Sequence, residues 1–254
     1  MEITDKEFWT NYWGNITIPV TVDYQLKNDR VIAQTIKKHV PSATDRRWAI
    51  EVGCAPGKWL IFLNKELNYN VVGYEYVAPA AEKTVQNLLS QNISTDHFKI
   101  ITGDFNKDTL QGAYDLVVSL GFIEHFTDLD AVLAKHLKIL NEKGYLVIGV
   151  PNFKGINYPI QKIVDRYLAD KMLPHHNLDA MDVNRYLDFA RDYKLDPLFV
   201  GYVGGFERGL FDVNAITNTP LRILMKIMMR SLTFLFGRSK SSFFNGYMIA
   251  ILRK

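Results

Sequence analysis

The sequence is poor in cysteine and in long apolar runs. It has one cysteine, Cys54, among 254 residues, which excludes a disulfide framework and a zinc site built from cysteines. No uninterrupted apolar stretch reaches the roughly 20 residues that a spanning helix needs. The first residues carry acids where a secretory signal would have its apolar core. These absences predict that the protein is located in a reducing compartment, and we expect that compartment to be the cytoplasm.

The chain also lacks a strong excess of charge. Thirty basic and 27 acidic residues leave a net charge of +3. Nucleic-acid-binding domains usually carry a larger and clustered basic excess, so we expect no nucleic-acid partner. The content of 48% hydrophobic and 22% charged residues is typical of a globular protein. A chain of this length buries a large core without disulfides or metals.

Short apolar runs alternate with segments of helical apolar spacing. This alternation predicts a doubly wound, Rossmann-like, mostly parallel α/β sheet with right-handed crossovers. Ligands bind such sheets beyond the carboxyl ends of the strands, so the loops after the first four strands are candidates for the site. We expect strands over 47–52, 69–76, 98–104, 114–120, 145–152, 197–203 and 244–254, a turn at 141–144, and helices over 28–40, 58–67, 78–92, 128–140, 158–172 and 179–193.

The segment AIEVGCAPGKW, residues 49–59, follows the first predicted strand and departs from two phosphate-binding motifs. A P-loop needs four residues between its glycines, whereas three separate Gly53 from Gly57. The dinucleotide motif Gly-x-Gly-x-x-Gly has a glycine where Ala55 stands. Pro56 also lacks the N–H that would meet a pyrophosphate. Both phosphate interpretations are therefore poor.

EVGCAPG, residues 51–57, instead resembles the first motif of class I S-adenosylmethionine-dependent methyltransferases, acid-x-Gly-x-Gly/Ala-x-Gly. The chain looks most like the small-molecule branch that contains the quinone-biosynthesis (type 11/23-like) enzymes. The resemblance covers roughly residues 45–152, with a weaker match at the C-terminus. It implies a seven-stranded sheet whose last strand is antiparallel, with helical cap insertions. It also implies S-adenosyl-L-methionine as methyl donor and S-adenosyl-L-homocysteine as product.

Three later loops carry the same resemblance. Glu75 ends the second strand eighteen residues after Gly57, where a carboxylate accepts hydrogen bonds from ribose hydroxyls. In GDF, the family pattern implies that Asp104 meets the adenine amino group and that Phe105 packs on the ring. A surface position for Glu75 and a role for Asp104 as a helix N-cap or a turn residue remain open.

The resemblance thus assigns a set of residues to the cofactor. The acid of the first motif would meet the ammonium group of the methionine moiety, and the small residues after it would let the backbone pass close to the ligand. The backbone of SLGFIEHF, residues 119–126, would face the methionine end. The assigned residues are Glu51, Gly53, Cys54, Ala55, Gly57, Glu75, Tyr76, Asp104, Phe105, Leu120 and Gly121.

The same segment contains the candidate catalytic residue, His125. Methyl transfer from a sulfonium depends largely on positioning and desolvation, and a general base helps where the acceptor carries a proton. An imidazole suits that task near neutral pH. The alternative is a structural histidine that caps a helix or bonds a carbonyl. For His175 and His176, no spacing with acids or cysteines supports a metal site, so we expect exposed loop histidines and no metal.

The N-terminal segment FWTNYWGN, residues 8–15, is rich in aromatic residues at helical spacing. One interpretation is a helix that packs on the domain, because aromatic side chains bury large areas. The other is a lid over the methyl donor, whose sulfonium suits an aromatic face. Tyr12 and Trp13 are the candidates for that contact.

We expect one methyltransferase domain over residues 1–254. Its parts are an N-terminal helical lid over 1–43, a cofactor-binding core over 44–150, a helical cap insertion over 151–195 and a basic, apolar helical insertion over 207–240.

The segment 219–240 is apolar over most of a helical surface, with Arg222, Lys226 and Arg230 in one stripe. It suits a buried or dimer-forming helix, a helix in a membrane interface, or a wall for an apolar substrate. A homodimer and peripheral membrane contact through residues 219–236 therefore both stay open.

The resemblance implies that the chain is an S-adenosylmethionine-dependent methyltransferase. It would transfer a methyl group to an oxygen, nitrogen or carbon atom of a small-molecule acceptor, with apolar or lipid-like acceptors among the candidates. Two alternatives are a nicotinamide-dependent oxidoreductase and a protein that binds S-adenosylmethionine without catalysis.

Overall fold

The computed structural model describes residues 2–14, 16–45, 47–110 and 112–254. Residue 15, the end of the predicted aromatic helix, lies outside these ranges. The described chain forms one seven-stranded sheet of order β3-β2-β1-β4-β5-β7-β6. The strands are β1 Trp48–Val52, β2 Asn70–Glu75, β3 Phe98–Thr102, β4 Tyr114–Leu120, β5 Leu140–Pro151, β6 Asp196–Val203 and β7 Tyr247–Arg253.

The strand directions confirm the predicted fold class. β1 pairs in parallel with β2 and β4, and the parallel pairing continues to β3 on one side and β5 on the other. β7 lies antiparallel between β5 and β6. The strand order reverses at β1 and β4, and the carboxyl ends of these two strands form the expected ligand edge.

Helices cover both faces of the sheet. Residues of α2, α3 and α4 pack on one face, and residues of α5 and α7 pack on the other, while Ile160 and Val164 of α6 belong to the same core cluster as α5 and α7. The helices are α1 Lys6–Gly14, α2 Lys27–His39, α3 Lys58–Leu67, α4 Ala78–Ser90, α5 Leu129–Lys138, α6 Asn157–Val164, α7 Val183–Asp192 and α8 Thr219–Phe236. The single-turn helices are η1 Thr95–His97, η2 Ile123–His125, η3 Leu173–His175, η4 Leu178–Met181, η5 Arg208–Leu210 and η6 Val213–Ala215.

Alternation along the strands divides the core between the two faces. In β1, Ala49 packs on the α2–α4 side, and Ile50 and Val52 pack on the other side. Successive strand side chains point to opposite faces, and a sheet covered on both faces therefore needs continuous apolar strands. This requirement explains why the central strands read as unbroken apolar runs.

The predicted turn at 141–144 is wrong, because these residues belong to β5. Tyr114 of β4 stands opposite Leu140, and the next pair joins Leu116 to Tyr145. The additional residues of β5 form a bulge in which Lys143 takes a positive φ of 64°. Residues 141–144 therefore form an irregular part of β5 and not a separate turn between two elements.

The helix predicted over 158–172 is shorter than expected. α6 ends at Val164, and the carboxylate of Asp165 accepts the backbone N–H groups of Met172 and Leu173. A side chain that binds backbone groups further along the chain competes with helix continuation. The chain therefore folds back on itself after α6.

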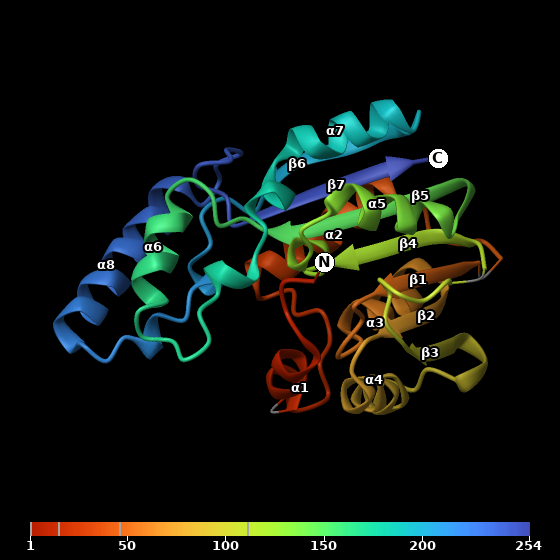
Figure 1. The fold of residues 1–254 in the computed structure, drawn as a ribbon, viewed down its shortest axis with the longest axis horizontal. Helices are drawn as coiled ribbons and strands as arrows, with labels where there is room; N and C mark the ends of the chain where they lie inside the picture. Colours follow the sequence, from red (N-terminus) through yellow and green to blue (C-terminus); the bar gives the residue numbers. More distant parts are fainter. Residues whose placement is uncertain (1, 15, 46, 111) are drawn as a thin grey trace.

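Figure 1 shows α6 and α8 on one side of the molecule, beyond the carboxyl ends of β4 and β5. The N-terminal α1 lies near the same edge of the sheet, close to α4. Among the described helices, none has both the length and the apolar character needed to cross a membrane. The insertions thus gather around the edge where the ligand site is expected.

Candidate cofactor and acceptor site

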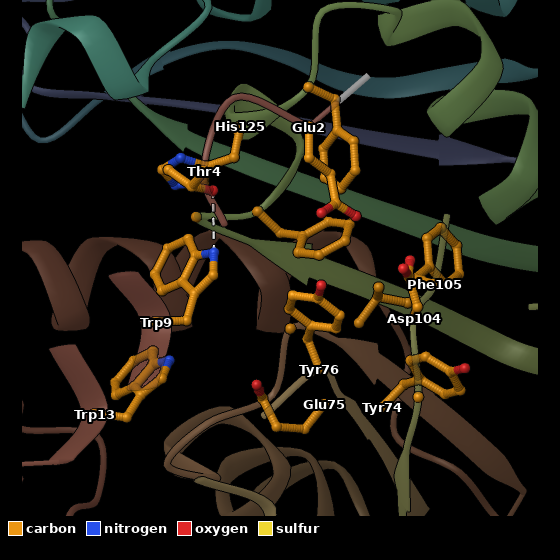
Figure 2. Close-up of a pocket in the computed structure, with 16 residues that line it drawn as sticks. Glu2, Thr4, Trp9, Trp13, Tyr74, Glu75, Tyr76, Asp104, Phe105 and His125 are labelled. Carbon is orange, nitrogen blue, oxygen red and sulfur yellow. Dashed lines mark hydrogen bonds between the residues drawn. The ribbon is translucent and has the colours of Figure 1, made fainter. Parts of the chain in front are cut away.

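Two adjoining cavities open at the carboxyl ends of the parallel strands. The first is narrow, about 60 Å³, and is bordered by the loops after β1, β2, β3 and β4 (Figure 2). The second is about 650 Å³ and extends toward α2, η3 and η5. Their shared wall consists of Trp9, Trp13, Gly53, Gly121 and His125. A long ligand would reach from one cavity into the other past this wall.

Glu75 ends β2 beside the first cavity and is 4% exposed, so a plain surface position is excluded. Its Oε2 accepts the N–H of Ala55 at 3.2 Å, and its Oε1 accepts the N–H of Val77 at 3.1 Å. Burial raises the pKa of this carboxyl in spite of these hydrogen bonds. The glycine-loop backbone and the carboxylate therefore hold each other in place at the cavity edge.

Asp104 and Phe105 border the first cavity after β3, as does Tyr76 after β2. The Asp104 carboxylate accepts the backbone N–H groups of Asn106 and Lys107 and pairs with the Lys107 ammonium at 2.9 Å. Burial acts to raise the pKa of Asp104, but these partners outweigh it and lower the pKa. The Asp104 side chain thus accepts from turn N–H groups, as its alternative interpretation required, while it lines the cavity. Phe105 is buried against His136, with ring centroids 4.6 Å apart.

Two glycines let the backbone approach a ligand. Gly53 has φ 73°, and a Cβ there would lie 2.8 Å from the Phe122 ring. Gly121 has φ 75°. Both conformations are costly for other residues. Gly57 precedes α3 with φ 90° and does not line either cavity, so its part in the loop is to allow the turn into the helix.

Glu51 lines the second cavity together with Cys54, Ala55 and Leu120. It is 2% exposed, and its Oε2 has no hydrogen-bond partner among the described residues. Burial, with Glu75 also acting in that direction, raises the pKa of Glu51 well above its usual value, although nearby Lys58 acts against this. A buried carboxyl of this kind favours a cationic partner.

Lys58 forms a second charged feature of the same cavity. Its ammonium lies 2.8 Å from Oδ1 of Asp29, a residue that is 7% exposed. The Asp29 carboxylate also accepts the N–H of Asp23 at 3.0 Å. This ion pair therefore links α2 to the start of α3 beside Glu51.

The N-terminal segment contributes Glu2, Thr4, Trp9 and Trp13 to the wall of the first cavity (Figure 2). The N–H of Ile3 donates to the His125 carbonyl at 2.8 Å, and the Trp9 indole donates to Thr4 at 3.0 Å. Trp13 borders both cavities, whereas Tyr12 borders only the second and is 52% exposed. Trp9, which the sequence did not single out for the ligand, also borders both and lies edge-on to His125 at 4.8 Å.

His125 joins the two cavities and is 6% exposed. Its Nδ1 donates to the His175 carbonyl at 2.8 Å, because a carbonyl can only accept. Its Nε2 lies 3.8 Å from Oε1 of Glu124. Burial, together with nearby His176, lowers the pKa of His125 to about 3, so the ring is neutral and Nε2 carries a lone pair. His125 thus forms the carbonyl bond of its structural alternative and also keeps one nitrogen available.

The expectation of exposed loop histidines is wrong for His176, which is 9% exposed and lines the second cavity. The structure also adds Glu2, Thr4 and Phe122 to the first cavity. Glu2 and Thr4 stand in no recognisable motif, whereas Phe122 lies within SLGFIEHF but was not assigned to the ligand. They reach the site because separate chain segments fold over the sheet edge, and sequence spacing does not report this.

The sheet order, the antiparallel β7 and the carboxylates after β1 and β2 define a class I methyltransferase fold. Residues 24–191 match the sequence family described as a methyltransferase domain, and the chain belongs to this family. The methyl donor of the family is S-adenosylmethionine. No curated protein matches the chain in sequence.

Solved structures of small-molecule methyltransferases share the fold. One is geranyl diphosphate C-methyltransferase from Streptomyces coelicolor A3(2), in complex with Mg²⁺, geranyl diphosphate and S-adenosyl-L-homocysteine. It has a TM-score of 0.62 and 14% identity, over 98% of this chain and 97% of that chain. Another is coclaurine N-methyltransferase bound to N-methylheliamine and S-adenosylhomocysteine. It has a TM-score of 0.61 and 10% identity, over 94% of this chain and 75% of that chain.

Proposed function

We propose that the protein transfers a methyl group from S-adenosylmethionine to a small-molecule acceptor. The observation that carries this proposal is the pair of buried carboxyls, Glu51 and Glu75, at the ends of neighbouring parallel strands. They face two joined cavities, and each meets the chemistry of one part of the cofactor. Glu51 would receive the ammonium, and Glu75 would receive the ribose hydroxyls.

The two cavities suit different parts of the reactants. The ribose and adenine would lie in the first, between Glu75, Asp104 and Phe105. The methionine moiety would enter the second between Glu51 and the backbone at Gly121. The methyl group would then face the remainder of the second cavity, where the acceptor binds.

The acceptor end is mostly apolar, with a few polar groups. Its apolar wall includes Ile16, Val20, Leu26, Trp59, Phe153, Met172 and Leu210, and its polar groups include Glu124, His125 and His176. Such a cavity suits a small, largely apolar molecule oriented by one or two polar contacts. His125 is the candidate to contact the reacting group, and the methylated atom would be an oxygen, nitrogen or carbon. Similar folds hold geranyl diphosphate and N-methylheliamine, which are small organic molecules.

Calorimetric titration with S-adenosylhomocysteine, S-adenosylmethionine and NADH tests this function. We expect both sulfur ligands to bind and NADH not to bind. Glu75→Gln should weaken binding by roughly 1.5–3 kcal/mol, the usual worth of a hydrogen bond to a charged group. Glu82→Gln on the exposed side of α4 is the matched control and should bind as the parent does. Binding of NADH alone would favour the oxidoreductase alternative.

Helix α8 supports a further part of the proposal, contact with a membrane surface. Ile223, Leu224, Ile227, Phe234 and Leu235 are 53–89% exposed. Along one side of this face run Arg222, Lys226 and Arg230, and α8 contains no acidic residue. An apolar face beside a basic row suits an anionic lipid interface.

A second copy of the chain fits this face less well than a lipid surface does. In a symmetric dimer the same patch contacts itself, so the basic rows of two helices would meet without acidic partners on α8. α8 packs against η5, and Gly209 and Leu210 of η5 line the second cavity. Membrane contact would therefore bring an apolar acceptor close to the cavity. We place the reaction at the cytoplasmic side, as the single buried thiol of Cys54 suggests.

A further inference from the structure

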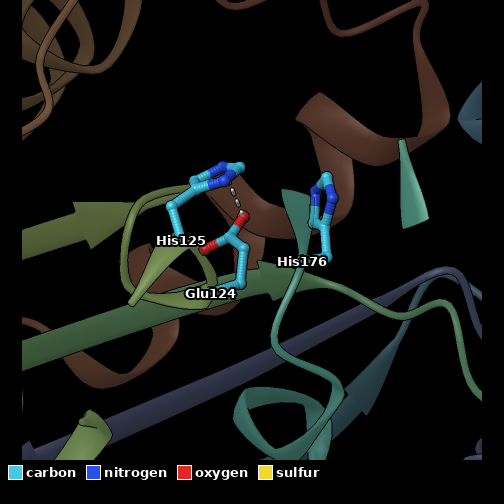
Figure 3. A group of neighbouring side chains, drawn as sticks. All are labelled: Glu124, His125 and His176. Atoms are coloured by element: carbon cyan, nitrogen blue, oxygen red, sulfur yellow. Dashed lines mark ion pairs between the residues drawn. The ribbon is translucent and has the colours of Figure 1, made fainter. Parts of the chain in front are cut away.

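Glu124, His125 and His176 form a cluster in the wall of the second cavity (Figure 3). One ligand atom from each lies within 4.8 Å of the others. Glu124 and His125 come from η2, after β4, whereas His176 follows η3 in the chain between β5 and β6. Fifty residues and more thus separate the two parts of the cluster, and no short motif reveals it.

Backbone hydrogen bonds orient both imidazoles toward the cluster. Nδ1 of His125 donates to the His175 carbonyl at 2.8 Å, and Nδ1 of His176 donates to the Met172 carbonyl at 2.7 Å. Each neutral ring therefore carries its lone pair on Nε2. The ring centroids lie 4.8 Å apart. Histidine ligands of metals are typically fixed in this way, with the second nitrogen bound to a carbonyl.

The third group is a carboxyl that is 1% exposed. Oε1 of Glu124 lies 3.8 Å from Nε2 of His125, and Oε2 has no hydrogen-bond partner among the described residues. Leaving such an oxygen unpaired is costly. A cation between the carboxylate and the two nitrogens would satisfy all three groups.

The two segments are clamped to each other beside the cluster. The N–H of Asn177 donates to the Glu124 carbonyl at 2.7 Å, and its side-chain amide donates to the Phe126 carbonyl at 2.9 Å. These bonds fix His176 relative to η2 through the residue next to it. The cluster is therefore held by rigid local structure.

We propose that Glu124, His125 and His176 bind a divalent transition-metal ion. Two imidazole nitrogens and one carboxylate oxygen are a ligand set used for Zn²⁺ and Fe²⁺ with positions left open for other ligands. One carboxylate leaves a net positive charge on the bound ion. Because the three residues line the second cavity, an anionic oxygen in that cavity would be able to bind the ion.

A bound ion would also affect the acceptor, and this consequence rests on the proposed function. A hydroxyl oxygen bound to the ion releases its proton more readily, because the metal lowers its pKa. The proton passes to water, the oxygen forms a bond to the methyl carbon, and the carbon–sulfur bond breaks with its electron pair left on sulfur. The lone pair of His125 then holds the ion and does not take the proton. The site would favour acceptors with an ionisable hydroxyl, such as phenols.

The test uses the full chain, freed of metal with a chelator and carrying no histidine tag. Zn²⁺ is titrated by calorimetry, and Co²⁺ is added separately to record its visible absorption spectrum. We expect one ion per chain and a Co²⁺ spectrum with nitrogen and oxygen ligands. His176→Asn and Glu124→Gln should each weaken Zn²⁺ binding at least tenfold. His97→Asn, far along the chain on η1, is the control and should bind Zn²⁺ unchanged.

Binding of S-adenosylhomocysteine is measured on the same samples, and it shows that each variant is folded. Absence of Zn²⁺ binding to the parent chain, or equal binding by the two cluster variants, overturns the metal site while leaving the proposed methyl donor intact. Zn²⁺ binding that depends on the cluster, without any binding of S-adenosylhomocysteine, supports the site and contradicts the proposed function. The inferred preference for hydroxyl-bearing acceptors is wrong if loading the chain with Zn²⁺ leaves the rate of phenol methylation unchanged.

Discussion

At the scale of single residues, the site is built around carboxyls that folding has removed from water. Glu51 is the clearest case, since its Oε2 has no partner among the described residues. Burial of an unpaired charge costs more than burial of a neutral carboxyl, so its pKa rises. A cationic ligand reverses this balance by stabilising the charged form.

Glu51 therefore predicts a link between cofactor binding and pH. In the free protein the raised pKa of Glu51 keeps the proton on the carboxyl to higher pH. If Glu51 meets the ligand ammonium as proposed, the ammonium would lower that pKa in the complex. Binding then releases protons and strengthens as pH rises. The Kd of S-adenosylhomocysteine should fall by up to about tenfold per pH unit as the pH rises from the pKa of Glu51 in the complex toward its raised pKa in the free protein.

Calorimetry in buffers of different ionisation enthalpy measures this proton release directly. Glu51→Gln cannot ionise and should bind S-adenosylhomocysteine more weakly, with less proton release. If the variant releases as many protons as the parent chain, Glu51 does not meet the ammonium. Glu75→Gln is a useful comparison, because ribose hydroxyls are neutral and should not lower the pKa of that carboxyl to the same extent.

The motif residues could be predicted from the sequence because each lies at the end of a strand or just after it. Glu51, Glu75, Asp104 and Gly121 all line the cavities, as strand ends meeting at one sheet edge require. The cluster with His176 could not be predicted, since its members meet only through contacts between distant loops. The assignment of Glu51, Glu75, Asp104 and Gly121 to the cofactor stays a prediction until binding is measured.

At the scale of elements, the N-terminal segment lines the first cavity, and we expect it to act as a lid. Lys83 of α4 anchors its end, because the ammonium donates to three carbonyls, those of Trp13 at 3.1 Å, Gly14 at 2.6 Å and Ile16 at 3.2 Å. These carbonyls lie at and beyond the C-terminal end of α1, where a positive charge is stabilising. The first cavity is narrow with the segment in this position, so we expect the segment to move when adenosine enters.

Lys83→Met keeps the aliphatic stem but removes the donor, and it should loosen this segment. We expect S-adenosylhomocysteine to dissociate at least tenfold faster, as the loss of one charged hydrogen bond of roughly 1.5–3 kcal/mol implies. Stopped-flow tryptophan fluorescence reports the change, since Trp9 and Trp13 lie on the segment. Lys65→Met, an exposed change on α3, should leave the rate as it is. Equal rates in Lys83→Met and the parent chain would show that the segment does not act as a lid.

The elements themselves were predictable to different degrees. α3 and β4 match their predicted ranges residue for residue, because strong apolar patterns and clear turn residues bound them. α6 is shorter and β5 is longer than predicted. Both differences arise from contacts outside the element, a carboxylate that binds distant backbone in one case and strand pairing in the other. The proposed division into a lid, a core, a cap and a basic insertion stays a prediction.

At the scale of the whole molecule, apolar side chains form both a buried core and an exposed face on α8. The apolar strands and the facing sides of the helices form the two halves of the core around one sheet. α8 contributes Met225 and Met229 to the buried side and leaves five large apolar side chains exposed. A large exposed apolar patch beside basic residues is typical of a contact surface. For this chain, the position of α8 beside η5 would connect that surface to the second cavity.

Co-sedimentation with lipid vesicles tests the orientation that follows from this surface. The protein should bind vesicles containing phosphatidylglycerol, bind phosphatidylcholine vesicles less, and lose affinity as salt rises, because the basic row is screened. Replacing Ile227 and Phe234 by serine together should weaken binding at least tenfold, since each side chain contributes on the order of 1.5–3 kcal/mol when buried. Leu187→Ser on exposed α7 is the matched control and should bind as the parent does. If no vesicle binds and sedimentation equilibrium shows a dimer that the double variant dissolves, α8 contacts a second copy and the membrane proposal is wrong.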